Sequence, residues 1–504
     1  MNAEEIASAY FNIESFYPNQ KELVESVLSG RDVIAVMPTG SGKSLCYQLP
    51  AIMLPGVTLV VSPLISLMKN QVAYLKSKGI YAECVDAYSE ADFNSQVYYL
   101  VEQGNVKILY VSPERLLNDQ FLSFIGHVHV SFIAVDEAHC ISLWGESFRP
   151  SYKLISKFID TLGYRPVIGA YTASATPAVR KDIIKGLGLK NPYTVVSGFN
   201  RPNLFLGIYR YDDKDSVLDS LLSLMNNQSG IVYCLTRNIS ETVYDRLKEN
   251  GVNVGLYHAG LSIQHRNKAQ AMFIRGEIKV MVATSAFGMG IDKKDIRFIF
   301  HYNPPLSIED YYQQIGRAGR DGQSSICQMV FNDKDFDLGR WMITSNSELL
   351  LREHSADKDE YIIAAFEKLD AMYRFCVTPG CYRHKLLAYF GEDSPAVCGR
   401  CNHCFGVENK IDVSEFARTY LKIVENAGSM ELKTLLEVIL EFTDSAGNKD
   451  SESDDSRVVR VLNRVMEEKL LILEPDGEGD YTVSLSESGS RFLHGDDRIY
   501  MNVN

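Results

Sequence analysis

The 504-residue sequence contains no apolar run that approaches the roughly 20 residues needed to cross a bilayer, which argues against a membrane protein. Charges throughout the first 30 residues argue against a signal peptide. Prolines are few, at 16, while 46% of the residues are apolar and 11% aromatic, which excludes a disordered or fibrous chain. At roughly 150 residues per domain, the length predicts three to four domains. We expect no secretion or membrane signal, and therefore a soluble, cytoplasmic protein.

The sequence also lacks the cysteine pattern of a secreted protein, and it lacks a positive net charge. Five of the ten cysteines stand alone in apolar segments, which indicates a reducing compartment: Cys46, Cys84, Cys140, Cys234 and Cys327. The net charge of −13 would oppose nucleic-acid binding if it were spread evenly. Residues 411–504 hold 10 basic and 20 acidic residues, a net of −10, so residues 1–410 carry only 41 − 44 = −3. The acidity therefore belongs to the C-terminal region.

Between about 30 and 340, short β-branched runs alternate with longer amphipathic segments, a pattern typical of βαβ units in a parallel sheet. A first series of strands is expected at 32–37, 57–62, 107–112, 132–136 and 167–172. A second series is expected at 230–234, 254–257, 279–283, 296–301 and 326–331. The segment Phe199–Leu204 between them is a poor helix or strand former. We therefore predict an α/β fold with two parallel-sheet lobes.

After residue 340 the apolar spacing changes to that of helices, over 361–373 and 384–390, and a cysteine cluster at 376–404 interrupts it. Further helices are expected at 413–426, 432–442 and 457–470, followed by strands at 471–474 and 481–485. Three helices and a hairpin indicate a winged helix. The polar, acidic segment Thr443–Ser456 is expected to be a linker.

A phosphate-binding loop follows the first strand, where residues 38–44 are Pro-Thr-Gly-Ser-Gly-Lys-Ser. Its glycines let backbone N–H groups approach phosphate oxygens, and the helix that follows adds its partial positive charge. Lys43 is expected on an exposed loop from which it reaches the outer phosphates, and Ser44 can ligate Mg²⁺. The candidate ATP-binding residues are Thr39, Gly40, Ser41, Gly42, Lys43 and Ser44.

An acidic pair, Asp136-Glu137, follows the apolar strand 132–136, at the strand end where ligands bind in open α/β sheets. Asp136 can hold the Mg²⁺ shell, and Glu137 can polarise the attacking water. The second lobe supplies Arg317 and Arg320, three residues apart and therefore on one face of a helix. An arginine brought to the γ-phosphate from a neighbouring lobe stabilises transition-state charge. Lys43, Asp136, Glu137, Arg317 and Arg320 are thus the candidate catalytic residues.

Together these motifs resemble the superfamily 2 helicases, and specifically the RecQ DNA helicases. The resemblance covers about 11–405. It is carried by Gly40–Ser44, Asp136–Cys140, Thr172–Thr176, Tyr257–Leu261 and Gln313–Arg320, and within the superfamily by Ile141–Tyr152 and Phe199–Leu204. It implies two RecA-like lobes, a zinc-binding helical subdomain and a winged helix, which we place at 1–204, 205–340, 341–410 and 411–504.

Several residues are candidate DNA contacts. Trp144, Phe148 and Arg149 offer stacking faces and a cation beside the ATP site, although the two aromatic residues are alternatively core residues. Two further candidate DNA contacts, each beside a strand of one lobe, are Ser62 and Thr284. This segment departs from the family at Leu143, Glu146 and Ser147, which puts the coupling of DNA contact to hydrolysis in doubt.

The N-terminal segment 16–20 resembles the family's adenine-reading segment, in which Gln20 can bond an adenine edge. Tyr17 stands where the family has arginine. It either supplies a stacking face or is a buried structural tyrosine.

Four cysteines form the candidate metal site: Cys381, Cys398, Cys401 and Cys404. Two gaps of two residues suit tetrahedral Zn²⁺, with Cys376 and His403 as rival ligands. The resemblance selects the four cysteines, in a closed structural site that braces the helices against the second lobe.

Arg457, Arg460 and Arg464 fall in one sector of a helix, opposite Val458, Val459, Leu462 and Val465, and could contact duplex phosphates. The alternative is a solvated face that pairs with neighbouring acids, and the acidic C-terminal region could instead bind a protein partner.

We therefore expect an ATP-dependent DNA helicase that uses ATP, Mg²⁺ and Zn²⁺, binds single-stranded and forked or junction DNA, and does not bind membranes. The resemblance implies 3′ to 5′ movement and work in repair or recombination, at the nucleoid if the cell is bacterial. The alternatives are a junction-binding scaffold whose ATPase does not drive unwinding, and an RNA helicase.

Overall fold

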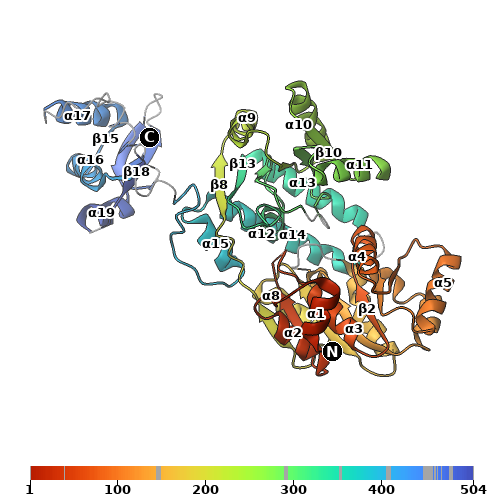
Figure 1. Cartoon of the computed structure of the whole chain (residues 1–504). Coiled ribbons are helices and arrows are strands. Elements are labelled where there is room, and N and C mark those ends of the chain that lie inside the picture. The colour runs from red at the N-terminus through yellow and green to blue at the C-terminus, as the bar shows by residue number, and fades with distance from the viewer. Residues whose placement is uncertain are drawn as a thin grey trace. The chain divides into compact units, whose positions relative to one another are not determined.

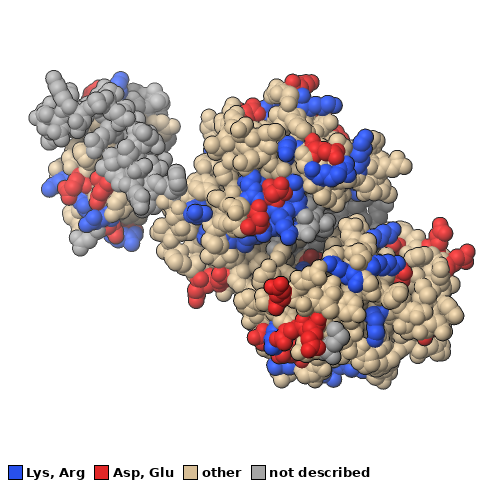
Figure 2. Space-filling view, viewed as in Figure 1, with Lys and Arg blue, Asp and Glu red and all other residues tan. Residues whose placement is uncertain are grey.

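The computed structural model describes residues 2–502 except 39, 144–148, 289–292, 351–354, 405–409, 446–457, 459, 460, 463, 467, 476–480 and 496. The chain divides into two compact units, Met1–His403 and Cys404–Asn504 (Figure 1). In the first unit, Lys and Arg are interspersed with Asp and Glu over the face shown in Figure 2, in keeping with the small net charge of residues 1–410. Within the described residues, no helix is both long and apolar enough to span a membrane.

Lobe 1 is built on a seven-stranded parallel sheet in the order β3-β4-β2-β5-β6-β1-β7. Its strands are β1 Val33–Val36, β2 Val57–Val61, β3 Ala82–Val85, β4 Ile108–Val111, β5 Val130–Val135, β6 Val167–Thr172 and β7 Tyr193–Val196. Its helices are α1 Ala3–Phe11, α2 Gln20–Leu28, α3 Leu45–Met53, α4 Ile65–Ser77, α5 Ala91–Glu102, α6 Asp119–Ile125, α7 Leu154–Thr161 and α8 Pro177–Gly186. Strands β1, β2 and β4 are buried along their whole length, as expected of strands covered on both faces.

Lobe 2 has a six-stranded parallel sheet in the order β10-β11-β9-β12-β13-β8. Its strands are β8 Leu204–Arg210, β9 Gly230–Tyr233, β10 Val254–Tyr257, β11 Val280–Ala283, β12 Phe298–His301 and β13 Ser325–Phe331. Its helices are α9 Lys214–Met225, α10 Arg237–Glu249, α11 Ile263–Ile274 and α12 Ile308–Ile315, followed by α13 Asp333–Leu350, α14 Ser355–Val377 and α15 Tyr382–Tyr389. The two predicted parallel-sheet lobes are confirmed.

The second unit packs helices against a small antiparallel sheet in the order β15-β17-β16. Its elements are β14 Lys410–Asp412, α16 Ser414–Ala427, β15 Ser429–Glu431, α17 Leu432–Ser445, β16 Leu471–Pro475, β17 Tyr481–Leu485, α19 Glu487–His494 and β18 Tyr500–Asn502. Val458, Leu462 and Val465 lie in its core, as the apolar face of the predicted third helix requires. The helices and hairpin follow the predicted order, whereas β14, β15, α19 and β18 are additions.

Candidate active site and metal centre

The phosphate-binding loop lies between β1 and α3, and the N-terminal segment holds its backbone. Gly40 and Gly42 have φ angles of +86° and +77°, in the left-handed region that favours glycine. The Gln20 side chain donates through Nε2 to the carbonyl oxygens of Ser41, at 2.9 Å, and Gly42, at 3.3 Å. A Cβ on Gly42 would lie 2.4 Å from that nitrogen, so a glycine is needed for this contact.

The structure distinguishes between the two alternatives for Tyr17. Its side chain is 64% exposed, so the alternative of a buried structural tyrosine is wrong. Gln20 is buried, and its Oε1 accepts from the Tyr17 N–H at 3.0 Å. The contact of Gln20 with adenine stays a prediction. In this structure its amide holds the phosphate-binding loop.

Lys43 forms ion pairs with both members of the acidic pair. Its Nζ lies 3.4 Å from Asp136 Oδ1 and 3.5 Å from Glu137 Oε1. The expectation of an exposed Lys43 is wrong, because its side chain is only 13% exposed and lies against the carboxylates that follow β5. Burial lowers the pKa of Lys43, but the attraction of Glu137 and Asp136 outweighs burial and leaves the pKa above its ordinary value. The amine is therefore charged.

The acidic pair occupies the carboxyl end of β5, and the backbone there is constrained. Glu137 has φ +47°, a left-handed conformation that costs a residue with a Cβ about 1 kcal/mol and that is found at functional sites. The buried Tyr152 hydroxyl donates to the Asp136 carbonyl oxygen at 2.9 Å. Burial raises the pKa of the Asp136 carboxyl, although Lys43 opposes this shift.

His139 joins the acidic pair to the end of β6, a contact that the sequence does not predict. Its Nδ1 lies 2.7 Å from Thr172 Oγ1 and 3.4 Å from Glu137 Oε2. Burial lowers the pKa of His139 to about 3, so the ring is neutral at physiological pH. Thr172 Oγ1 also accepts from the Ser174 N–H at 3.3 Å. Sequence motifs containing His139 and Thr172 were recognised, but no role was assigned to either residue.

The donor set at the end of β5 fits a hard divalent cation. Asp136 Oδ1 and Glu137 Oε2 are buried and accept no hydrogen bond from any described residue. Carboxylate oxygens of this kind are ligands that Mg²⁺ favours, usually together with substrate phosphates and water.

Arg317 and Arg320 lie in the turns that follow α12, which ends at Ile315, so the expectation that they share one face of a helix is wrong. The two arginines also occupy different environments. Arg317 is 4% exposed and donates to the Gly288 carbonyl oxygen and, at 3.1 Å, to Gln313 Oε1. Its side chain is therefore bound within lobe 2. Arg320 instead approaches lobe 1, where its Cγ and Cδ lie 3.9 Å from the position of a Cβ on Gly40. The structure thus brings Arg320, from the second lobe, to the phosphate-binding loop of the first.

The four predicted cysteine ligands converge. The sulfur atoms of Cys381, Cys398, Cys401 and Cys404 lie within 4.8 Å of one another. Sγ of Cys401 is 3.9 Å from Sγ of Cys381, close to the roughly 3.8 Å expected of thiolates on a tetrahedral Zn²⁺ with Zn–S bonds near 2.3 Å. The backbone N–H groups of His384 and Arg400 donate to Cys381 Sγ at 3.4 Å and Cys398 Sγ at 3.3 Å, and such hydrogen bonds orient metal ligands.

Among the described residues, the rival ligands Cys376 and His403 do not belong to the group of converging cysteines. The segment from Cys398 to Cys404 also covers the edge of the lobe 2 sheet. The Leu206 N–H donates to the Arg400 carbonyl at 3.1 Å, and the Asn402 N–H donates to the Leu206 carbonyl at 2.9 Å. Strand β8 would otherwise present unpaired backbone groups at the sheet edge. These contacts attach the cysteine-bearing segment to the second lobe, and the bracing of the helices by the site stays a prediction.

Cys398→Ser is expected to lose tightly bound zinc and to lower the unfolding temperature. Removing one thiolate opens the coordination shell, and in a structural site the metal-binding energy contributes to folding. Metal analysis with thermal unfolding measures both effects. Cys376→Ser is the matched control, because this buried cysteine lies outside the group and its variant should keep one zinc per chain. Freshly purified wild-type protein without zinc would refute the assignment.

The candidate DNA contacts are less completely defined. Arg149 donates to the Pro63 carbonyl at 2.9 Å, just after β2. Ser62 is 1% exposed and its Oγ makes no hydrogen bond to a described residue, and Thr284 follows β11 at intermediate exposure. Arg464 pairs with Glu468, four residues further along the chain. The other candidates, Thr39 of the ATP site and Trp144, Phe148, Arg457 and Arg460, lie outside the described residues, as do Glu146 and Ser147.

The chain has two tandem parallel-sheet lobes. One lobe carries the phosphate-binding loop and the acidic pair, and the other carries Arg317 and Arg320. This arrangement defines an ATP-driven motor of the helicase class. The chain matches the DEAD/DEAH box helicase model over 17–183, the helicase conserved C-terminal domain over 213–322, and the RecQ zinc-binding model over 333–405. A solved structure of the DUF1998 helicase MrfA, bound to DNA and AMPPNP, shares the fold with a TM-score of 0.57 at 17% identity, covering 97% of this chain and 62% of that chain.

Curated relatives identify the family. The ATP-dependent DNA helicase RecQ of Bacillus subtilis is 39% identical over 454 residues, which is 89% of this chain and 74% of the relative. RecQ of Pasteurella multocida is 37% identical over 433 residues, or 84% of this chain and 66% of the relative. The chain belongs to the RecQ family of ATP-dependent DNA helicases.

Proposed function

We propose that the chain couples ATP hydrolysis to 3′ to 5′ movement along single-stranded DNA and to duplex unwinding in repair or recombination. The approach of Arg320 to the phosphate-binding loop carries this proposal. An arginine supplied by the second lobe makes hydrolysis depend on the arrangement of the two lobes, and a motor needs that dependence.

Within this cycle, Ser44 and Asp136 would hold Mg²⁺, which neutralises charge that develops on the phosphates. Lys43 would bind the outer phosphates and Glu137 would orient the attacking water. The left-handed backbone at Glu137 sets the direction in which its side chain leaves the main chain. Neutral His139, which is hydrogen-bonded to Thr172 on β6 and lies 3.4 Å from Glu137 Oε2, would transmit changes at this site to β6.

Strand separation measured on substrates with a 3′ or a 5′ single-stranded tail tests the proposal. ATP turnover should rise with single-stranded DNA, and only the 3′-tailed duplex should be unwound. Turnover that rises with DNA but separates neither duplex would favour the junction-binding scaffold. Stimulation by RNA in place of DNA would favour the RNA helicase.

We also propose that the C-terminal unit is a winged helix that binds forked duplex through Arg457, Arg460 and Arg464. Arg464→Glu should weaken fork binding and flatten its dependence on salt by about 0.9 in the log-log slope, the contribution of one phosphate contact. Arg498→Glu makes the same charge change beside Asp412 and serves as the control. If both variants leave the slope unchanged, the stripe has no DNA role and the acidic region is better explained by a protein partner.

A further inference from the structure

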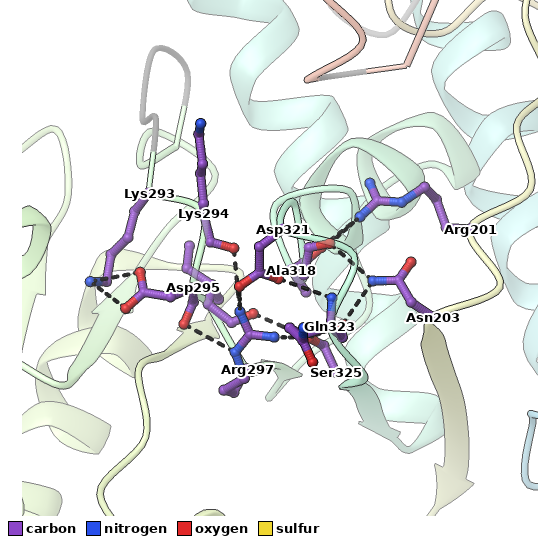
Figure 3. Close-up of polar contacts among 12 residues, drawn as sticks. Arg201, Asn203, Lys293, Lys294, Asp295, Arg297, Ala318, Asp321, Gln323 and Ser325 are labelled. Carbon is purple, nitrogen blue, oxygen red and sulfur yellow. Dashed lines mark hydrogen bonds and ion pairs between the residues drawn. The ribbon is translucent and has the colours of Figure 1, made fainter.

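The segment that joins the two lobes holds the loop that carries the arginines. The interlobe linker, Phe199–Asn203, lies between β7 and β8. The Arg201 guanidinium donates to the carbonyl oxygens of Gly316 at 3.3 Å, Ala318 at 2.9 Å and Gly319 at 3.0 Å. Asn203 Nδ2 donates to the carbonyl oxygens of Gly319 and Gln323, both at 2.9 Å (Figure 3).

These contacts fall on backbone groups that the helix no longer satisfies. Helix α12 ends at Ile315, and carbonyl groups at a helix end need partners outside the helix. The Gly319 carbonyl accepts from Arg201, from Asn203 and from the Gly322 N–H at 3.0 Å. That carbonyl belongs to the peptide bond leading directly into Arg320. The linker therefore fixes the backbone from which the Arg320 side chain extends.

The packing at Gly319 leaves no room for a side chain. Gly319 has φ +54°, and a Cβ there would lie 2.4 Å from Asn203 Nδ2 and 2.7 Å from the Gln323 carbonyl oxygen. On its other side, the loop is closed by an ion pair between Arg297 and Asp321 (Figure 3). Asp321 Oδ1 also accepts a hydrogen bond from the Gln323 N–H at 3.1 Å. The loop is thus held from both sides, and the linker supplies the side-chain hydrogen bonds to the Gly319 carbonyl of the peptide that precedes Arg320.

The linker is itself anchored to helix α15 and the residue after it, which follow Cys381 of the metal site. Arg383, 7% exposed at the start of α15, donates to Asn200 Oδ1 at 3.1 Å, to the Arg201 carbonyl at 2.6 Å and to the Leu204 carbonyl. Phe199 stacks on Phe390, with ring centroids 4.6 Å apart and planes at 13°. Arg201 and Asn203 consequently project from a backbone that is fixed on its opposite side.

We propose that Arg201 and Asn203 are positioning residues that set the rate of ATP hydrolysis by holding Arg320 against the phosphate-binding loop. This inference rests on the proposed role of Arg320. A charged group stabilises a transition state only where it is correctly placed, and a displacement of about 1 Å costs roughly 10²-fold in rate. Without the linker contacts, the Arg320 backbone is free to shift by such a distance while ATP still binds lobe 1.

Arg201→Ala and Asn203→Ala, made in the full-length protein, test the proposal. Each should lower kcat by about 10- to 100-fold, with ATP affinity, measured by a nonhydrolysable analogue, and single-stranded DNA affinity within about twofold of wild type. Arg246→Ala is the matched control, because this half-buried arginine of α10 pairs with Asp215 and Asp219 in the same lobe. Arg246→Ala should lower stability and leave kcat unchanged.

Double variants separate positioning from a merely structural role. If Arg201 acts through Arg320, the Arg201→Ala, Arg320→Ala double variant should turn over ATP at the rate of Arg320→Ala alone. Multiplied effects, or parallel losses of kcat and ATP affinity in both linker variants, would overturn the proposal. If Arg320→Ala alone hydrolyses ATP normally, the proposed function of Arg320 fails. If Arg320→Ala is slow while both linker variants are normal, only the positioning inference fails.

Discussion

Lys43→Ala is expected to reduce ATP hydrolysis by roughly 10²- to 10³-fold, the effect of removing one preorganised electrostatic donor. Lys43 is a largely covered cation, 13% exposed, that faces both Asp136 and Glu137. Its loss removes the charge that would bind the outer phosphates and also leaves two carboxylates side by side. Steady-state turnover at saturating ATP measures the first effect.

The same variant should also lose fold stability, because a buried carboxylate is left without its cation at a cost of about 3 kcal/mol. Burial already raises the pKa of Asp136, and Lys43 opposes that shift. In the variant the folded pKa rises further above its unfolded value. The stability linked to Asp136 is then present below the unfolded pKa and lost as pH rises through the folded pKa. Urea unfolding should therefore show a larger deficit at pH 7 than in mild acid.

Lys214→Met separates turnover from stability. Lys214 is a buried lysine, with its Nζ 2.6 Å from Asp335 Oδ1, and it lies at the start of α9 in lobe 2. Its loss should lower the unfolding free energy while turnover remains near that of wild type. Near wild-type hydrolysis in Lys43→Ala would overturn the assignment of the phosphate-binding loop.

The local elements of this fold are predictable because their signals are contiguous. The predicted ranges of β6, β10 and β17 agree with the structure residue for residue. Each is a short β-branched or aromatic run bounded by turn formers, which suits a covered strand. The phosphate-binding loop, acidic pair and cysteine spacing are likewise short motifs whose chemistry requires particular neighbours in sequence.

Strands β3, β7 and β8 are not predicted, because their stability comes from distant partners. Strand β3 contains Glu83 in a four-residue run at a sheet edge, and β7 alternates exposed and buried residues weakly. Strand β8 is completed by pairing with β13 on one side and by a bridge from Leu206 to Cys401 on the other. No local pattern specifies a partner so far along the chain.

The same limit applies to the site. The ion pairs of Lys43 depend on how the loop folds back on β5, and the bonds from Arg201 and Asn203 to the arginine loop join residues 115–120 positions apart. In the sequence, the segment Phe199–Leu204 is only a family marker and a break between the lobes. A run of Asn and Arg side chains in such a break could have suggested hydrogen bonds to backbone carbonyls, but not to which ones.

Arg320→Ala is expected to lower turnover by roughly 10³-fold or more, the effect of removing an arginine that stabilises charge on a transferring phosphoryl group. The side chain reaches Gly40 across the lobes, and an interaction formed mainly in the transition state contributes little to ground-state affinity. The Kd for a nonhydrolysable ATP analogue should therefore stay within a few-fold of wild type. Arg317→Ala provides the comparison, because Arg317 is bound to Gly288 and Gln313 within lobe 2 and its loss should lower the stability of that lobe. A collapse of ATP affinity in step with turnover would make Arg320 a binding residue and Arg317 the better candidate for the transition state.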